Sequence, residues 1–295
     1  MKRMTVMWIV FAFASALFAS LTSILAKCGI KKTDSTVAAA IRTIVVLITA
    51  VIMAGISGSL GSIVDISTKT WIFLVLSGLA TGASWLCYFR ALQLGEVNKV
   101  VPIDKSSVIL TLILAFIFLD DKITLLKGVC IVLIGAGTFL MIEKKKTDSD
   151  GEKDKRSSWI IYAVLSAVFA SLTSILGKTG IDGVESNLGT AIRTAVVLVM
   201  AWVMVFVTKK GGEIKKAPKN ELLFICLSGL ATGASWLCYY KALRDGSAAT
   251  VVAIDKLSIL GTIAFSRIVF KEKLTVKSGI GLALIVAGTM LMLVK

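Results

Sequence analysis

Long apolar stretches follow one another along nearly the whole chain and are separated by short polar loops. Five of them fall in the first half, at residues 5–26, 37–56, 70–92, 100–119 and 124–142. A transmembrane helix needs roughly 20 mostly apolar residues, and each stretch has about that length. The pattern predicts an all-α integral membrane protein.

The second half of the chain repeats the first at a constant offset of 151 residues. Residues 18–27 read FASLTSILAK and residues 169–178 read FASLTSILGK, while SGLATGASWLCYFRAL at residue 77 returns as SGLATGASWLCYYKAL at residue 228. Gapless self-similarity of this kind indicates a tandem duplication. We expect a first five-helix repeat over residues 1–142, a polar linker over 143–158 and a second repeat over 159–295.

Each repeat has an odd number of predicted helices, so the second repeat must enter the membrane from the opposite side to the first. The sequence thus predicts ten transmembrane helices arranged as two inverted five-helix repeats. Many secondary transporters have this architecture and bind their substrate near the membrane midplane between the halves. A duplicated scaffold without a transport pathway is the alternative.

The composition also fits a membrane protein, with 56% hydrophobic and 17% charged residues. The net charge of +15 is spread over short loops rather than gathered in a basic domain, so nucleic acid is not an expected partner. The chain has no histidine, and its five cysteines lack C-x-x-C spacing, so His-based catalysis is excluded and no metal site is indicated. We expect neither an enzyme nor a cofactor.

The loop charges predict an orientation. On the linker side the loops hold 17 Lys and Arg residues, against 7 on the side of the termini. Because positively charged loops stay in the cytoplasm, the count places the linker in the cytoplasm and both termini outside, in a multi-pass protein of the cell membrane.

Charged residues inside the predicted helices occur as repeat pairs: Lys27 and Lys178, Arg42 and Arg193, Asp104 and Asp255, Lys105 and Lys256. Charges at membrane depth are costly and therefore indicate functional sites. The arginines suit a clamp for carboxylate or phosphate because a planar guanidinium pairs with two oxygens at once. The aspartates would be their counter-ions and proton acceptors. Buried ion pairs that only join helices, and a Lys27 that reaches back to the membrane surface, are the alternatives.

Polar residues share helical faces with these charges, and such faces should point away from lipid. The aromatic pairs Trp85 and Trp236, and Tyr88 and Tyr239, could stack on a substrate, with packing or a membrane-interface belt as the alternative. The polar faces are Ser20, Ser23, Lys27; Ser77, Thr81, Ser84, Tyr88; Asp104, Ser107, Thr111; and their repeat mates, which include Ser171, Ser174 and Lys178.

These residues resemble a known family. The run YFRALQLGEVNKVVPIDK over residues 88–105, and the runs FLDDKIT and FKEKLT before the last helix of each repeat, look like the EamA family of the drug/metabolite transporter superfamily. The IRT and IDK segments resemble in particular its short five-helix members, which are thought to work as antiparallel dimers; this chain would be a fused version of such a dimer.

The resemblance implies ten helices around a central cavity and the efflux or exchange of metabolites. It also implies cytoplasmic termini, which is the opposite of what the loop charges predict. Asp121 stands where the second repeat has Glu272, so no transport role is assigned to that carboxylate.

The sequence therefore predicts a secondary transporter that moves a small anionic or zwitterionic metabolite by alternating access. With Arg90 and its repeat mate Lys241 included, the charges deep in each repeat sum to +3, which favours anions. Two alternatives stay open: a proton-coupled exporter of organic cations or drugs that uses Asp104 and Asp255, and a lipid-carrier flippase. The expected partners are a small-molecule substrate and the lipid bilayer, and a monomer would suffice because both halves lie in one chain.

Overall fold

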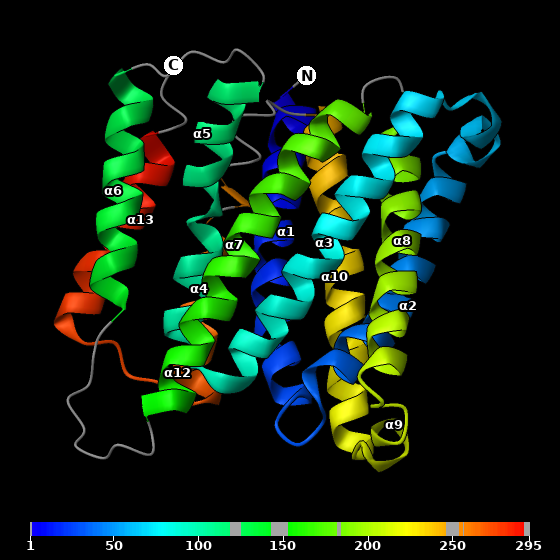
Figure 1. The fold of residues 1–295 in the computed structure, drawn as a ribbon. Helices are drawn as coiled ribbons and strands as arrows, with labels where there is room; N and C mark the ends of the chain where they lie inside the picture. Colours follow the sequence, from blue (N-terminus) through cyan, green and yellow to red (C-terminus); the bar gives the residue numbers. More distant parts are fainter. Residues whose placement is uncertain are drawn as a thin grey trace.

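The computed structural model is a bundle of helices and describes residues 2–118, 125–142, 153–181, 184–245, 254–255 and 257–291 (Figure 1). No β-strand occurs within these ranges. Six helices are long and apolar enough to cross a membrane, and three shorter apolar helices accompany them in the described part of the chain. The all-α membrane architecture expected from the hydrophobic pattern is confirmed.

The first repeat matches the predicted helices except at the fourth. Its elements are α1 (Lys2–Gly29), α2 (Ser35–Ile56), the 3-10 helix η1 (Ser59–Asp65), α3 (Thr68–Leu94), α4 (Val97–Lys105), α5 (Ser107–Phe118) and α6 (Leu125–Met141). The expected fourth helix is divided at Ser106 into α4 and α5. The Ser106 hydroxyl donates to the Ile103 carbonyl at 2.7 Å and so competes with the helical backbone bonds, close to Pro102, which has no N–H to give.

The second repeat begins earlier than predicted. Its elements are α7 (Lys153–Ile181), α8 (Ser186–Val207), α9 (Glu213–Lys216), α10 (Lys219–Asp245), α12 (Ser258–Val269) and α13 (Val276–Leu291). Residues 153–158, expected in the linker, form the first turns of α7. A helix that continues beyond its apolar stretch keeps its backbone groups hydrogen-bonded, and Lys and Arg are good helix formers. The rest of the linker, residues 143–152, lies outside the described residues.

The two repeats run in opposite directions. Figure 1 shows α1 descending from the end where the N-terminus lies, whereas its repeat mate α7 rises from the opposite end. The same reversal relates α2 to α8, α3 to α10 and α6 to α13, and α13 finishes at the end of the bundle where α1 begins. The predicted inverted repeats are confirmed.

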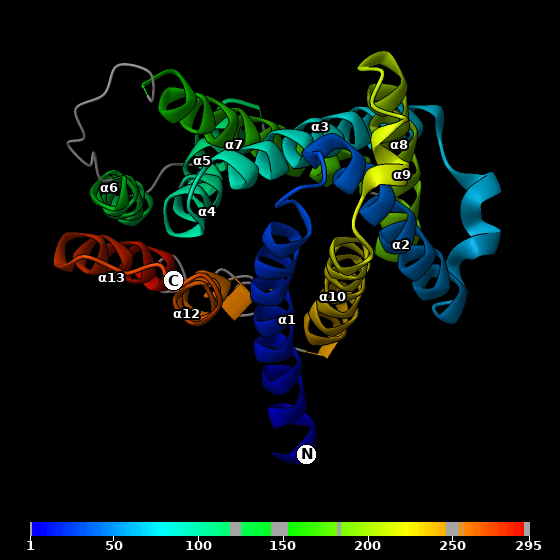
Figure 2. The same cartoon turned by 90° about the horizontal axis from the view of Figure 1, so that it is seen from below.

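The repeats are interleaved rather than set side by side. The first helix of each packs against the third helix of the other, α1 on α10 and α7 on α3, while α2 packs on α8 and α6 on α13. Figure 2 shows the α6–α13 pair at one end of the molecule and the α2–α8 pair toward the other. The centre of the bundle is therefore built by both repeats, and this is where the site lies.

Glycines allow the close approach of the helices at this centre. A Cβ on Gly78 of α3 would lie 2.8 Å from Val196 of α8, and a Cβ on its mate Gly229 of α10 would lie 2.8 Å from Val45 of α2. Small residues bring helix backbones together in this way in membrane proteins. The third helix of each repeat thereby packs closely against the second helix of the other.

Most of the predicted polar faces point inward. Ser20, Ser77, Ser171 and Ser228 are all buried. Ser174 is exposed, against the prediction; its hydroxyl donates to the Ala170 carbonyl of its own helix and so needs no partner from a neighbour. Outward-facing positions carry large apolar side chains, for example Met7, Val10, Phe13 and Leu17 of α1, as a lipid-facing surface requires.

Candidate functional site

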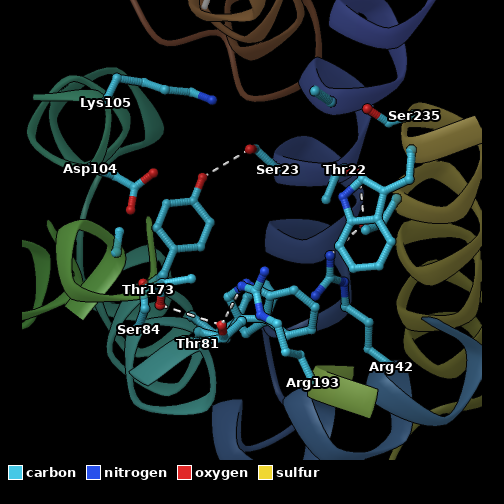
Figure 3. A pocket seen from close by; sticks show the side chains of 17 residues that line it. Thr22, Ser23, Arg42, Thr81, Ser84, Asp104, Lys105, Thr173, Arg193 and Ser235 are labelled. Carbon is cyan, nitrogen blue, oxygen red and sulfur yellow. Dashed lines mark hydrogen bonds between the residues drawn. The ribbon is translucent and has the colours of Figure 1, made fainter. Parts of the chain in front are cut away.

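A cavity of about 360 Å³ lies between the two repeats (Figure 3). Its walls come from α1, α2, α3 and α4 of the first repeat and from α7, α8 and α10 of the second. The lining combines hydroxyl groups, aromatic rings and charged side chains. The predicted site residues that line it are Arg42, Arg193, Asp104, Lys105, Trp85, Trp236 and Tyr88.

Arg42 on α2 is held from several sides. It is 4% exposed, and its Nε donates to Ser228 at 3.1 Å while Nη2 donates to the hydroxyl of Thr232. The guanidinium carbon lies 4.7 Å from the ring centre of Trp85 and 4.9 Å from that of Phe89, within the range of cation–π attraction. Its Nη1 is buried and has no hydrogen-bond partner among the described residues. The guanidinium is therefore fixed by its other contacts while Nη1 has no acceptor among the described residues.

Arg193, the repeat mate on α8, occupies the equivalent place. Its Nη2 donates to Thr81 at 3.1 Å, and Thr81 is the repeat mate of Thr232. Figure 3 shows both arginines on the same side of the cavity. Each repeat thus contributes one arginine, and each arginine is anchored to the third helix of the other repeat.

Asp104 and Lys105 line the cavity from the last turn of α4, directly before the break at Ser106. The carboxylate of Asp104 accepts a hydrogen bond from Ser166 of α7 at 2.8 Å. The expected ion pair with Arg42 is not formed in the part of the chain that the structure describes, because Arg42 is anchored to hydroxyl groups of α10 instead.

Other predicted site residues lie away from the cavity lining. Asp255 accepts a hydrogen bond from Ser15 at 3.2 Å, the symmetric counterpart of the Asp104–Ser166 bond, and Tyr239 packs against the buried cluster of Ala12, Ala242 and Ile254. The side chain of Lys178 and the whole of Lys256 lie outside the described residues.

Lys27 has a different environment from the one predicted. Its ammonium group donates to the Gly95 carbonyl and lies 3.5 Å from Glu272. Lys27 therefore does not line the cavity. Its ammonium group is held by Gly95 and Glu272 and does not extend unpartnered to the membrane surface.

Glu272 was missed by the sequence analysis as an organising residue. One of its carboxylate oxygens accepts the backbone N–H of Val97 at 3.0 Å, and the other accepts the N–H of Asn98 at 3.0 Å and the hydroxyl of Ser266 at 2.7 Å. Glu272 thus caps α4 from the other repeat, where a carboxylate is favoured by the unpaired N–H groups and the helix dipole. We call this group, with Lys27, the Glu272 clasp. Its repeat counterpart Asp121 lies outside the described residues.

A second group of contacts ties the loop between α1 and α2 to the second repeat. Glu221 accepts the backbone N–H of Lys32 at 3.0 Å and that of Thr33 at 2.7 Å, and Lys210 forms an ion pair with Asp34 at 2.8 Å. Burial alone would raise the pKa of Asp34, but the hydrogen bonds from Lys210 and from the backbone hold that pKa below its ordinary value. Polar contacts therefore join the repeats at the end of the bundle where α9 lies.

Several lining residues were not singled out from the sequence. Thr22 and Thr173 face the cavity and are repeat mates within the FASLTSIL motif, so exact repetition of a polar residue was the signal that could have found them. Phe89 has no such signal, because the second repeat carries a tyrosine at the matching position.

The family model described as EamA-like transporter family matches residues 6–143 and 157–294, one match for each repeat. The chain belongs to the EamA-like transporter family. This confirms the resemblance drawn from the run over residues 88–105. The two matched ranges are displaced by the same 151 residues as the repeats.

Two curated relatives carry transporter names. An "uncharacterized transporter in cobO 3'region" of Sinorhizobium sp. is 42% identical over 134 residues, which are 45% of this chain and 95% of the relative. The "uncharacterized transporter YxxF" of Bacillus subtilis (strain 168) is 23% identical over 225 residues, which are 75% of this chain and 70% of the relative. The first relative therefore has about the length of one repeat.

A solved crystal structure shares the fold of the whole EamA chain. It aligns with a TM-score of 0.64 over 97% of this chain and 96% of its own, at 16% sequence identity.

Proposed function

We propose that this EamA protein is a secondary transporter that moves a small anionic or zwitterionic metabolite across the cell membrane by alternating access. The observation that carries the proposal is the buried Nη1 of Arg42, which is directed to no protein acceptor among the described residues and belongs to a residue that lines the central cavity. A buried charge without an opposite charge is costly, so a carboxylate or phosphate of the substrate is the natural partner.

The arrangement of the two arginines supports a shared anion clamp. Arg42 and Arg193 come from opposite repeats and line one cavity, so one anion between them contacts both halves of the molecule. A hydrogen bond to a charged group contributes about 1.5–3 kcal/mol, or roughly a 10- to 100-fold change in affinity. The contacts of such an anion with each repeat would change as the repeats move.

Polar contacts between the repeats at one end of the bundle support alternating access. The Glu272 clasp and the Glu221 and Lys210 contacts join the repeats on the side of α9. All of these are hydrogen bonds or ion pairs between separate segments, which can open without unfolding a helix. Release of these contacts would expose the cavity to that side.

The test is solid-supported-membrane electrophysiology on proteoliposomes that contain the full chain. The screen covers carboxylates, amino acids, phosphates and amines, with and without a pH gradient. We expect currents for anions or zwitterions that fall at least about tenfold in Arg42→Met. Arg90→Met is the matched control, because Arg90 lies on α3 outside the cavity lining and donates to Gln93. Anion currents that persist in Arg42→Met and in the double variant with Arg193→Met would contradict the clamp.

An exporter of organic cations is the second candidate, because Asp104 also lines the cavity. In that case the same screen would give currents for amines only, and Asp104→Asn rather than Arg42→Met would abolish them.

A further inference from the structure

The cavity holds more charge than an anion clamp requires. Besides the two arginines, its lining includes Asp104 and Lys105, which are consecutive residues at the end of α4. Figure 3 shows these two side chains on the opposite side of the cavity from Arg42. The lining therefore presents a second polar region that contains both a carboxylate and an ammonium group.

These charges do not cancel within the cavity wall. Asp104 is hydrogen-bonded to the neutral hydroxyl of Ser166, and Arg42 is bonded to two hydroxyl groups of α10. Within the described ranges, Lys105 takes part in no ion pair. Unpaired charges are expensive in a site shielded from water, so an occluded substrate has to supply the opposite charges.

Charge matching narrows the substrate class. A simple zwitterion would satisfy Arg42 with its carboxylate and Asp104 with its ammonium group, but would leave Lys105 unpaired. A dicarboxylate without an amine would satisfy the arginine pair and Lys105 but would place no cation on Asp104. A molecule with two acidic groups and one amine would provide an opposite charge for the arginine pair, for Lys105 and for Asp104.

We infer that the substrate is a zwitterion with a second acidic group, of the acidic amino acid class; this rests on the anion clamp of the proposed function. One carboxylate binds between Arg42 and Arg193, the ammonium group binds Asp104, and the second acid binds Lys105. The cavity of about 360 Å³ suits a small metabolite, since small-molecule sites span about 300–1,000 Å³.

The test is isothermal titration of the purified full chain with L-glutamate, L-aspartate, L-glutamine, L-asparagine and glutarate. We expect one of the acidic amino acids to bind at least tenfold more tightly than its own amide and than glutarate. In Lys105→Met the acid and its amide should bind within about threefold of each other, because the residue that distinguishes them is gone. Lys99→Met is the matched control: Lys99 lies on the same helix, outside the cavity lining, and pairs with Glu96, so the preference for the acid should persist.

The outcomes separate this inference from the proposed function. If the amides bind as tightly as the acids, or if Lys105→Met keeps the preference, the second acidic group is not recognised and the inference is overturned, while the clamp stands as long as Arg42→Met abolishes binding. If none of the five compounds binds but another anion does in an Arg42-dependent way, the inference is also overturned. If no anion binds at all, both fail.

Discussion

The two repeats share arginine and aspartate contacts at the centre of the molecule and carry different residues at one of its ends. At the centre, Arg42 donates to Thr232 and Arg193 donates to Thr81, and the Asp104–Ser166 bond has its counterpart in Asp255–Ser15. At the end where α9 lies, two carboxylates of the second repeat hold backbone N–H groups of the first, and their repeat mates are different residues. Glu221 and Glu272 correspond to Thr70 and Asp121.

This contrast suggests separate roles for the centre, where the substrate would bind, and for the end, where contacts join the repeats. A substrate that binds between inverted repeats meets similar groups whichever side is open, so symmetry is useful where the substrate binds. The contacts that close each end act separately, and different residues allow the two ends to differ in stability. We interpret the centre as the binding region and the Glu272 clasp as part of the closure of one end.

Substitution of the paired glycines at the centre, Gly78 and Gly229, tests whether the two halves pack alike. We expect these variants to show the largest loss of stability. Gly78→Ala would place a methyl group 2.8 Å from Val196 and 2.9 Å from the Arg193 carbonyl, and Gly229→Ala would meet Val45 and the Arg42 carbonyl at 2.8 and 3.1 Å. Each should lower the free energy of unfolding by about 1–3 kcal/mol, measured by titration with SDS in mixed micelles.

The control for these variants is Gly279→Ala, since nothing lies within 4 Å of a Cβ at that position. Similar losses for Gly78 and Gly229 and none for Gly279 would support the symmetric centre. A Gly229 variant as stable as the unmodified protein, beside an unstable Gly78 variant, would show that the two halves pack differently.

The difference between the ends is tested by Glu272→Gln, where a smaller effect is expected. Loss of the charged cap should weaken the start of α4 by about 0.5–2 kcal/mol, so amide hydrogen exchange at Val97 and Asn98 should accelerate roughly 2- to 30-fold. Glu96→Gln is the matched control, because Glu96 stands at the N-cap position of α4 but its side chain makes no capping bond. Equal amide exchange rates at Val97 and Asn98 in the two variants would contradict a capping role for Glu272.

The sequence predicted the fold well because duplication and membrane solubility both leave clear patterns. The offset of 151 residues, the apolar stretches and the odd number of helices in each repeat were sufficient for the inverted architecture. The break in the fourth helix was missed, although it lies at Ser106 within the polar run 104–107, close to Pro102.

The lining of the cavity was predicted in part. Arg42, Arg193 and Asp104 were found because intramembrane charges are rare, yet the partners of Arg42 were not, because residue types alone do not show which helices pack together. Glu272 escaped because its role depends on the start of α4 in the other repeat, a contact between residues 175 positions apart in the chain. Repetition identifies what the repeats share, whereas Glu272 differs in residue type from its repeat mate Asp121, which lies outside the described residues.

The central claim is that arginines from both repeats form one binding site. The most direct measurement is isothermal titration of the anion that gives the largest transport current against the unmodified protein, Arg42→Met and Arg193→Met. We predict one anion bound per chain and loss of binding in either single variant. Binding of two anions per chain, or binding of one anion that persists in both single variants, would contradict a site shared between the repeats.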